Sequence, residues 1–66
     1  MTVVVNGETR ELADGVTVAE IVGMLVDSER GVAVALDGDV VPRSAWPTTA
    51  VDSGQRVEIL TAVQGG

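Results

Sequence analysis

The sequence predicts an α+β fold in which one helix packs on one face of a mixed sheet of four to five strands. Three features support this prediction: Val-rich runs near both ends of the chain, an Asn-Gly turn after the first run, and one short amphipathic segment with its own start signal. Val is β-branched and suits the pleated, half-buried surface of a strand. With 66 residues, the chain is expected to form a single domain over residues 1–66.

The first run and the segment after it are expected to form a β-hairpin. Asn6-Gly7 separates residues 3–5, which are all valine, from residues 8–12. An Asn-Gly pair between two strand-like runs is a strong hairpin signal, because a type I′ turn requires positive φ at both central residues. The sequence therefore predicts that residues 2–5 and 8–12 pair antiparallel.

One helix is expected over residues 18–27. Thr17 is a candidate N-cap, and Glu20 three residues later completes a capping box, in which each side chain satisfies a backbone N–H group. Val16 and Ile21 fit a hydrophobic staple across this cap. An apolar stripe at helical spacing follows, made of Val18, Ile21, Val22 and Leu25. The helix is expected to end near Asp27-Ser28.

The second half of the chain is expected to supply the remaining strands. In order, it contains an apolar run at 32–36, an Asp37-Gly38 turn, a short strand at Val40-Val41, an irregular segment at 44–49 and a last strand at 57–62. Pro42 ends the short strand and indicates a sheet edge, because proline cannot donate to a ladder. Residues 2–5 and 56–62 are expected to lie adjacent and parallel in the middle of the sheet. This order of elements is the β-grasp arrangement, which ubiquitin also has.

The composition argues against several classes of function. The net charge is −6, Lys is absent and the arginines are scattered, so binding to nucleic acid or to anionic membranes is not expected. No apolar run reaches the ~18 residues of a spanning helix and no signal-peptide pattern opens the chain, so a soluble, cytoplasmic protein is expected. Without Cys or His, a metal site would need carboxylates alone. Asp37-Gly38-Asp39 lacks the later ligands of an EF-hand and is interpreted as a turn. With so few catalytic groups, the chain is not expected to be an enzyme.

The Gly65-Gly66 ending is the candidate functional group. It closes a segment of four residues after the last strand, so residues 63–66 are expected to form a flexible tail. Glycine lacks Cβ, which lets the backbone thread a narrow channel and leaves the terminal carbonyl carbon open to attack. A C-terminal carboxylate, with a pKa of about 3.3–3.7, is anionic at neutral pH and inert as an acyl donor. It would need activation, most simply as an acyl-adenylate from ATP, by another protein, because this chain has no phosphate-binding motif. The simpler alternative is a frayed chain end.

Three segments resemble a known family. Asn6-Gly7-Glu8 is similar to the opening turn of the ThiS family, the sulfur carriers of thiamine (thiazole) biosynthesis. Residues 40–46, Val-Val-Pro-Arg-Ser-Ala-Trp, resemble the middle segment of that family. Residues 57–66, Val-Glu-Ile-Leu-Thr-Ala-Val-Gln-Gly-Gly, resemble its ending. The resemblance covers nearly the whole chain and implies a ubiquitin-like β-grasp fold.

The resemblance also implies a mechanism and a set of partners. A ubiquitin-activating-like adenylyltransferase would use ATP to adenylate Gly66, while the carrier itself would bind no cofactor. Sulfur that comes ultimately from a cysteine desulfurase would replace AMP, and Gly66 would then carry a thiocarboxylate. Thiazole synthase would take that sulfur. Val63, Gln64 and Gly65 would form the stem that threads the partner's channel.

Two other functions stay open at this point. The chain could be a β-grasp carrier for another sulfur pathway, such as that of molybdopterin, cysteine or another sulfur-containing product. It could also be a ubiquitin-like interaction module whose tail has no chemistry. For docking to a partner, Val41 and Trp46 are the candidate side chains, since exposed aromatics are favoured interface anchors. Trp46 fits the core equally well. Arg43 could bind a carboxylate or phosphate, but a surface ion pair is the simpler expectation.

Overall fold

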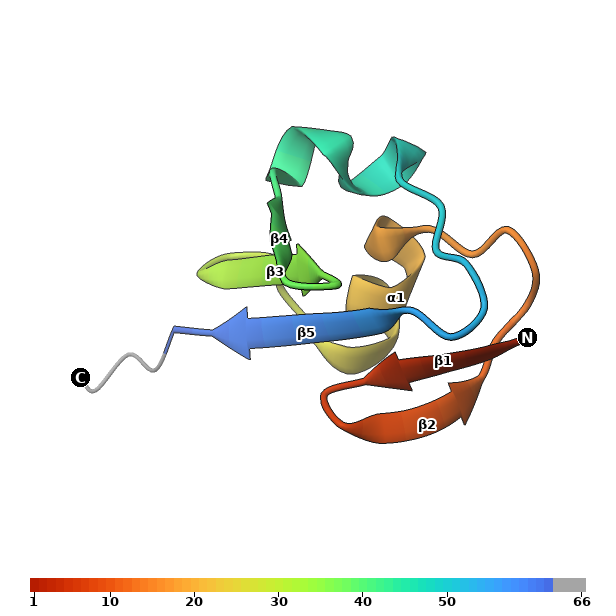
Figure 1. The fold of residues 1–66 in the computed structure, drawn as a ribbon. Helices are drawn as coiled ribbons and strands as arrows, with labels where there is room; N and C mark the ends of the chain where they lie inside the picture. The colour runs from red at the N-terminus through yellow and green to blue at the C-terminus, as the bar shows by residue number, and fades with distance from the viewer. Residues whose placement is uncertain (63–66) are drawn as a thin grey trace.

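The computed structural model describes residues 1–62, and the expected tail at 63–66 lies outside this range. The elements are β1 (Thr2–Val5), β2 (Glu8–Glu11), α1 (Val18–Leu25), β3 (Val32–Leu36), β4 (Asp39–Val41), the 3₁₀ helix η1 (Arg43–Thr48) and β5 (Arg56–Thr61). They form a five-stranded sheet in the order β2-β1-β5-β3-β4 (Figure 1). β1 and β5 pair in parallel and all other neighbours pair antiparallel. The predicted mixed sheet, with the first and last strands adjacent and parallel, is confirmed.

The β1–β2 hairpin forms around the Asn-Gly turn as predicted. Asn6 has φ 49° and Gly7 has φ 81°, the positive values that a type I′ turn requires. Val5 faces Glu8 across the turn, and the pairing continues to Thr2 and Glu11.

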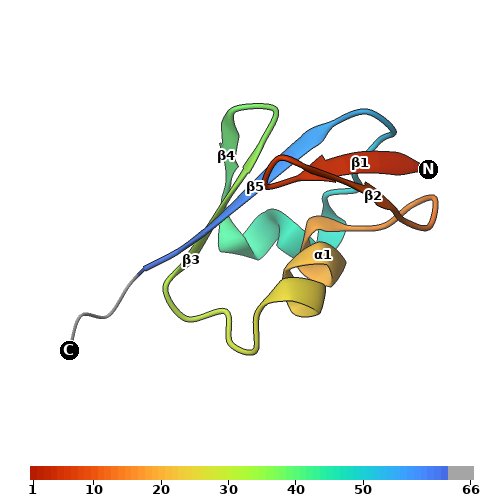
Figure 2. The same ribbon diagram turned by 90° about the horizontal axis from the view of Figure 1, so that it is seen from below.

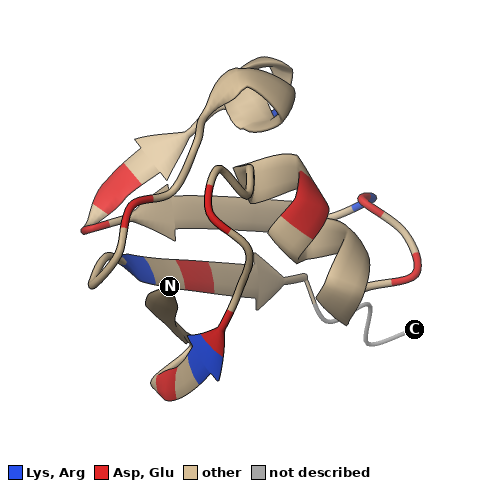
Figure 3. Ribbon diagram, turned by 90° about the vertical axis from the view of Figure 1, so that its right-hand side faces the viewer, with Lys and Arg blue, Asp and Glu red and all other residues tan. Residues whose placement is uncertain are grey.

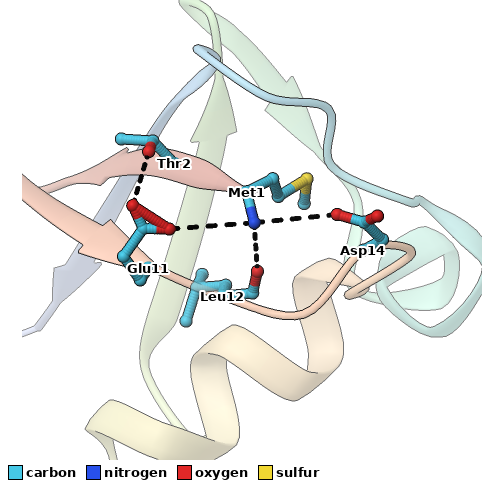
Figure 4. A network of polar contacts seen from close by, with 5 residues as sticks. All are labelled: Met1, Thr2, Glu11, Leu12 and Asp14. Atoms are coloured by element: carbon cyan, nitrogen blue, oxygen red, sulfur yellow. Dashed lines mark hydrogen bonds and ion pairs between the residues drawn. The ribbon is translucent and has the colours of Figure 1, made fainter.

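Met1 extends this hairpin by one residue. Its ammonium group donates to the Leu12 carbonyl at 2.8 Å, and the Leu12 N–H donates back to the Met1 carbonyl at 2.8 Å. The ammonium also lies 3.8 Å from a Glu11 carboxylate oxygen and 3.6 Å from one of Asp14 (Figure 4). These two carboxylates are exposed, so the ion pairs contribute about 0–1 kcal/mol each, and the backbone pairing is the stronger tie.

α1 begins at the predicted capping box. The Glu20 N–H donates to the Thr17 hydroxyl at 3.2 Å, and the Thr17 N–H donates to the Glu20 carboxylate at 2.9 Å. The helix ends at Leu25, earlier than the expected residue 27, and Val26 is already extended at its C-cap. A carboxylate is unfavourable at the negative end of the helix dipole. Asp27 therefore suits a position outside the helix better than one in its last turn.

The core lies between one face of the sheet and the layer formed by α1 and η1 (Figure 2). The buried side chains come from both layers and from the segments that join them: Val3, Val5, Val16, Val18, Ile21, Val22, Val34, Trp46, Val51, Val57 and Ile59. Within the described residues, no polar or charged residue is buried. The stability of this domain therefore depends on apolar contacts between a Val-rich sheet face and a short helix.

The segment predicted to be irregular, residues 44–49, is largely the 3₁₀ helix η1. Trp46 determines its position: the ring is 2% exposed, and the indole N–H donates to the Val41 carbonyl at 2.9 Å. A ring that fills the core while its N–H is satisfied by β4 holds this segment against the sheet. The expected edge strand before Pro42 is confirmed as β4, which among residues 1–62 pairs only with β3.

Candidate functional site at the base of the C-terminal segment

The candidate site is the end of β5, from which the C-terminal segment starts. β5 ends at Thr61, and Ala62 is the last described residue. The expected working residue Gly66, and the expected stem Val63, Gln64 and Gly65, lie outside the described residues. What the structure describes is therefore the base of this segment: the residues that hold the end of β5 on either side.

On the β3 side, Gly31 holds Ala62. The Ala62 N–H donates to the Gly31 carbonyl at 2.7 Å, one position beyond the Val32–Thr61 pair that ends the β3–β5 ladder. Gly31 has φ +72°, and a Cβ added to it would lie 3.3 Å from the Ala62 Cβ. Glycine is therefore favoured here, because another residue would strain the backbone and its Cβ would push Ala62 away by a few tenths of an ångström.

On the β1 side, the Asn6 side chain continues the sheet where β1 stops. Its Oδ1 accepts from the Ile59 N–H at 2.8 Å, and its Nδ2 donates to the Ile59 carbonyl at 3.2 Å. An amide side chain offers the same donor and acceptor as a peptide group. Asn6 thus satisfies a part-buried backbone position of β5 that lies 53 residues away in sequence.

The loop before Gly31 is tied to η1. The Arg43 guanidinium donates to the Glu29 carbonyl and lies 5.6 Å from the centroid of the Trp46 ring. The Val32 N–H also donates to the Glu29 carbonyl, at 3.2 Å. Among residues 1–62, Arg43 does not form the expected surface ion pair. Its guanidinium instead bonds a backbone carbonyl and stacks near a buried ring.

The open face of the sheet, which neither α1 nor η1 covers, carries exposed apolar side chains. Leu60 of β5 is 68% exposed and Val40 of β4 is 78% exposed. Their partners across β3, Ala33 and Ala35, are small. Leu60 lies two residues before Ala62, so this apolar surface adjoins the base of the C-terminal segment.

The two docking candidates from the sequence have different positions. Trp46 belongs to the core. The expectation of an exposed aromatic anchor at this position is therefore wrong, and its alternative, a core position, is confirmed. Val41 is half-buried and packs against the core cluster, and its docking role stays a prediction. The exposure of Leu60 was not predicted, because the apolar pattern of residues 57–62 does not tell which side of the strand α1 covers.

The charged groups are spread over the surface rather than gathered at this site (Figure 3). In the described part of the chain, no three acidic side chains lie close enough to hold a metal ion. The Asp37 carboxylate accepts from the Arg56 N–H at 2.9 Å and from the Gln55 amide at 2.9 Å. The backbone bond, and then the amide bond, lower the pKa of Asp37 below its ordinary value of 3.8. The Asp37-Gly38 turn is confirmed, and the Asp37 side chain is bound to the start of β5.

A shallow depression lies elsewhere on the described surface. Its volume is about 290 Å³, and it is lined by Val4, Gly7, Arg56, Val57 and Glu58. It lies at the start of β5, whereas the C-terminal segment begins at the other end. No helix among residues 1–62 is long and apolar enough to span a membrane.

A fold of this kind, with an anchored last strand that leads into Gly-Gly, defines a ubiquitin-like β-grasp domain. Comparison with known proteins gives the family. The ThiS family model matches residues 3–66, and the chain belongs to that family. The sulfur carrier protein ThiS of Escherichia coli K12 is 29% identical over 66 residues, which is 100% of both chains.

A longer relative and two solved structures agree with this assignment. A thiazole synthase of Paramagnetospirillum magneticum is 36% identical over 66 residues; the match covers 100% of this chain but only 20% of that protein. The crystal structure of the thiamine biosynthesis protein ThiS from Geobacter metallireducens is 35% identical, with a TM-score of 0.83 and full coverage of both chains. The solution structure from the same organism has a TM-score of 0.80 and 35% identity, and the match covers 88% of that chain.

Proposed function

We propose that this chain carries sulfur for thiazole formation in thiamine biosynthesis, with Gly66 as the residue that is activated and then bears the sulfur. The observation that carries the proposal is the family match over residues 3–66, which includes the Gly65-Gly66 ending. The anchored end of β5 supports it, because a carrier needs a stable body that presents a reactive end at a defined place.

The chemistry proceeds in balanced steps. A carboxylate oxygen of Gly66 attacks the α-phosphorus of ATP, which gives the acyl-adenylate and releases pyrophosphate. A thiol first reduces the sulfur donor's persulfide and releases sulfide (HS⁻). The sulfide then attacks the carbonyl carbon, AMP leaves, a proton goes to solvent, and a thiocarboxylate results. The carrier supplies the acyl group, and its partners supply the catalytic groups.

The proposed partners follow from this chemistry. A ubiquitin-activating-like adenylyltransferase binds ATP and forms the adenylate, and a cysteine desulfurase is the ultimate source of the sulfur. Thiazole synthase is the proposed acceptor. A relative with that name contains a segment similar to the whole of this chain, which supports the pairing.

The activating partner is proposed to contact the open face of the sheet. Four residues follow Ala62, and fully extended they span about 13–14 Å. A partner that binds Gly66 in its active site must therefore approach the body of the carrier closely. Leu60 lies next to this base and is 68% exposed, so it is the proposed apolar anchor; Val40 of the edge strand β4, 78% exposed, lies on the same face.

Intact-mass spectrometry tests the proposal directly. The chain is co-expressed with an adenylyltransferase and a desulfurase, and a fraction should show the mass increase of one sulfur in place of one oxygen. A chain that lacks Gly66 is the control and should stay unmodified. If a known ThiS is converted under the same conditions while this chain is not, the proposal is wrong. An interaction module without tail chemistry would show only the unmodified mass in this assay.

A further inference from the structure

Gly31 differs from the other described glycines that have positive φ. A Cβ added to it would meet the Ala62 Cβ at 3.3 Å and the Ala62 nitrogen at 3.9 Å. At the other positions an added Cβ would have no atom within 4 Å; these are Gly7, Gly15, Gly38 and Gly54. Among the described residues, only Ala62 comes close to an added Cβ at Gly31, and Ala62 is the last described residue before the C-terminal segment.

The contact between Gly31 and Ala62 has two parts. The Gly31 carbonyl accepts the Ala62 N–H at 2.7 Å, and the bare α-carbon of Gly31 leaves room for the Ala62 methyl group. Both residues are exposed, and neither belongs to the core cluster. A change here moves the base of the C-terminal segment without repacking the interior.

Contacts with η1 fix the loop that precedes Gly31. The loop that leads to it is bonded to η1 through the Arg43 guanidinium and the Glu29 carbonyl, and η1 is fixed by the buried Trp46. The position of Ala62 is therefore connected to the core by a short chain of contacts.

We propose that Gly31 is a positioning residue for the activation of Gly66. By holding Ala62 through its carbonyl and its bare α-carbon, it fixes the point and direction from which the C-terminal segment leaves the sheet. The inference rests on the proposed function and adds to it a residue outside the C-terminal segment, 31 positions before Ala62 in the sequence.

The expected effect on adenylation follows from the length of the C-terminal segment. Four residues follow Ala62 and span about 13–14 Å when extended, so a small rotation at their base displaces the carboxyl carbon by a larger distance. Misplacing reacting atoms by ~1 Å can lower a rate by ~100-fold. Because a Cβ at residue 31 shifts Ala62 by less than ~1 Å, a smaller decrease, on the order of tenfold in the kcat of adenylation, is expected.

The test measures ATP-dependent pyrophosphate release with the adenylyltransferase for four variants. Gly31→Ala introduces both a Cβ and backbone strain, whereas Gly31→Asn introduces a Cβ with a residue that tolerates positive φ. Gly38→Ala is the matched control, because it has φ +87° and no atom near its added Cβ. Gly31→Ala combined with Ala62→Gly removes the methyl group that the new Cβ would meet.

A positioning role predicts a distinct pattern. Both single substitutions at Gly31 should lower kcat while the KM for the carrier stays near that of Gly38→Ala, and the double variant should recover much of the rate. If Gly31→Ala fails to fold, the adenylation rate of Gly31→Asn tests the proposal instead. Adenylation of Gly31→Asn at the same rate as the wild type would overturn the proposal. A wild-type chain that is not adenylated would instead overturn the proposed function itself.

Discussion

At the scale of single residues, two polar side chains hold distant parts of the chain together. Asn6 bonds both backbone groups of Ile59, and Asp37 accepts bonds from the Gln55 side chain and the Arg56 backbone. Both residues have φ 49°, a conformation that Asn and Asp tolerate better than other non-glycine residues. Each of these two residues therefore lies in a turn, while its side chain forms a hydrogen bond to β5.

Removing the Asn6 side chain should destabilise the domain. Asn6→Gly keeps the positive φ accessible but leaves the part-buried N–H and carbonyl of Ile59 without their partner, at a cost of about 1–3 kcal/mol. Urea denaturation measures the loss. Asn6→Asp keeps an acceptor for the Ile59 N–H and should lie between the wild type and Asn6→Gly. Equal stability of Asn6→Gly and the wild type would show that these bonds contribute nothing net.

Asp37 should make stability depend on pH in the acid range. Its pKa is lowered in the folded state, so its contribution is complete above the ordinary value of 3.8 and is lost as pH falls through the folded value. Asp37→Asn should therefore be less stable than the wild type at pH 7, and the difference should shrink as the pH drops below about 4. Urea midpoints at both pH values measure this.

The neighbouring carboxylate provides the control for that experiment. Asp39 makes no side-chain hydrogen bond to the described residues, so Asp39→Asn should follow the wild type at both pH values. If Asp37→Asn also keeps a constant difference from the wild type across the range, the bonds to β5 do not couple stability to proton binding.

At the scale of elements, α1 needs both its cap and its packing. It has 8 residues, whereas isolated helices below ~12–15 residues are marginal in water. Its start is tied to the segment after η1, because the Val18 N–H donates to the Thr49 carbonyl at 2.9 Å and the Val51 N–H donates to the Val16 carbonyl at 2.9 Å. Helix formation and docking of η1 are therefore coupled.

Loss of the Thr17 hydroxyl should weaken this element. Thr17→Ala removes the acceptor for the Glu20 N–H and should lower the free energy of unfolding by about 0.5–2 kcal/mol. Thermal unfolding followed by circular dichroism gives the measurement. Thr17→Ser retains the hydroxyl and should stay close to the wild type. A Thr17→Ala chain as stable as Thr17→Ser would contradict a role for the cap.

At the scale of the whole molecule, the buried core is separate from the surfaces that we propose to meet a partner. The core joins α1, η1 and one sheet face, while the open face and the base of the C-terminal segment are exposed. Changes at the open face or beyond Ala62 should therefore alter activation by a partner and leave folding largely intact.

The length of the C-terminal segment should be critical for activation. Deleting Gly66, or adding one residue after it, moves the terminal carboxyl by about 3.3–3.6 Å along an extended chain. An error of ~1 Å at the reacting atoms can cost ~100-fold in rate, so adenylation should be lost. Thermal midpoints should change little, because exposed changes usually stay within about ±0.5 kcal/mol. Near-normal adenylation of the shortened chain would rule out Gly66 as the working residue.

Leu60 should matter for binding to the activating partner. Burying a Leu side chain is worth about 1.5–3 kcal/mol, so Leu60→Ser should raise the KM for the carrier about tenfold or more. Met24 is 56% exposed on α1, on the other side of the sheet, and Met24→Ser is the matched control. Equal KM values for the two variants would place the partner away from the open face.

The sequence by itself determined the features that depend on neighbours within a few residues. Asn6-Gly7 requires a tight hairpin turn and Thr17–Glu20 a helix start, because the bonds and φ values involved are local. The identity of the ending, Gly65-Gly66, is also read directly, and the family resemblance that it carries is confirmed.

Only the tertiary structure decided the rest, because these contacts join residues that the chain order separates. The parallel pairing of β1 with β5 brings Asn6 to Ile59, and the β3–β5 ladder brings Gly31 to Ala62. Burial of Trp46 depends on how η1 packs on the sheet, so no local pattern separated core from docking surface. The exposure of Leu60 follows from the face that α1 covers. The two contacts, the burial of Trp46 and the exposure of Leu60 share one physical reason. The packing of elements across the sheet determines which residues distant in sequence come into contact.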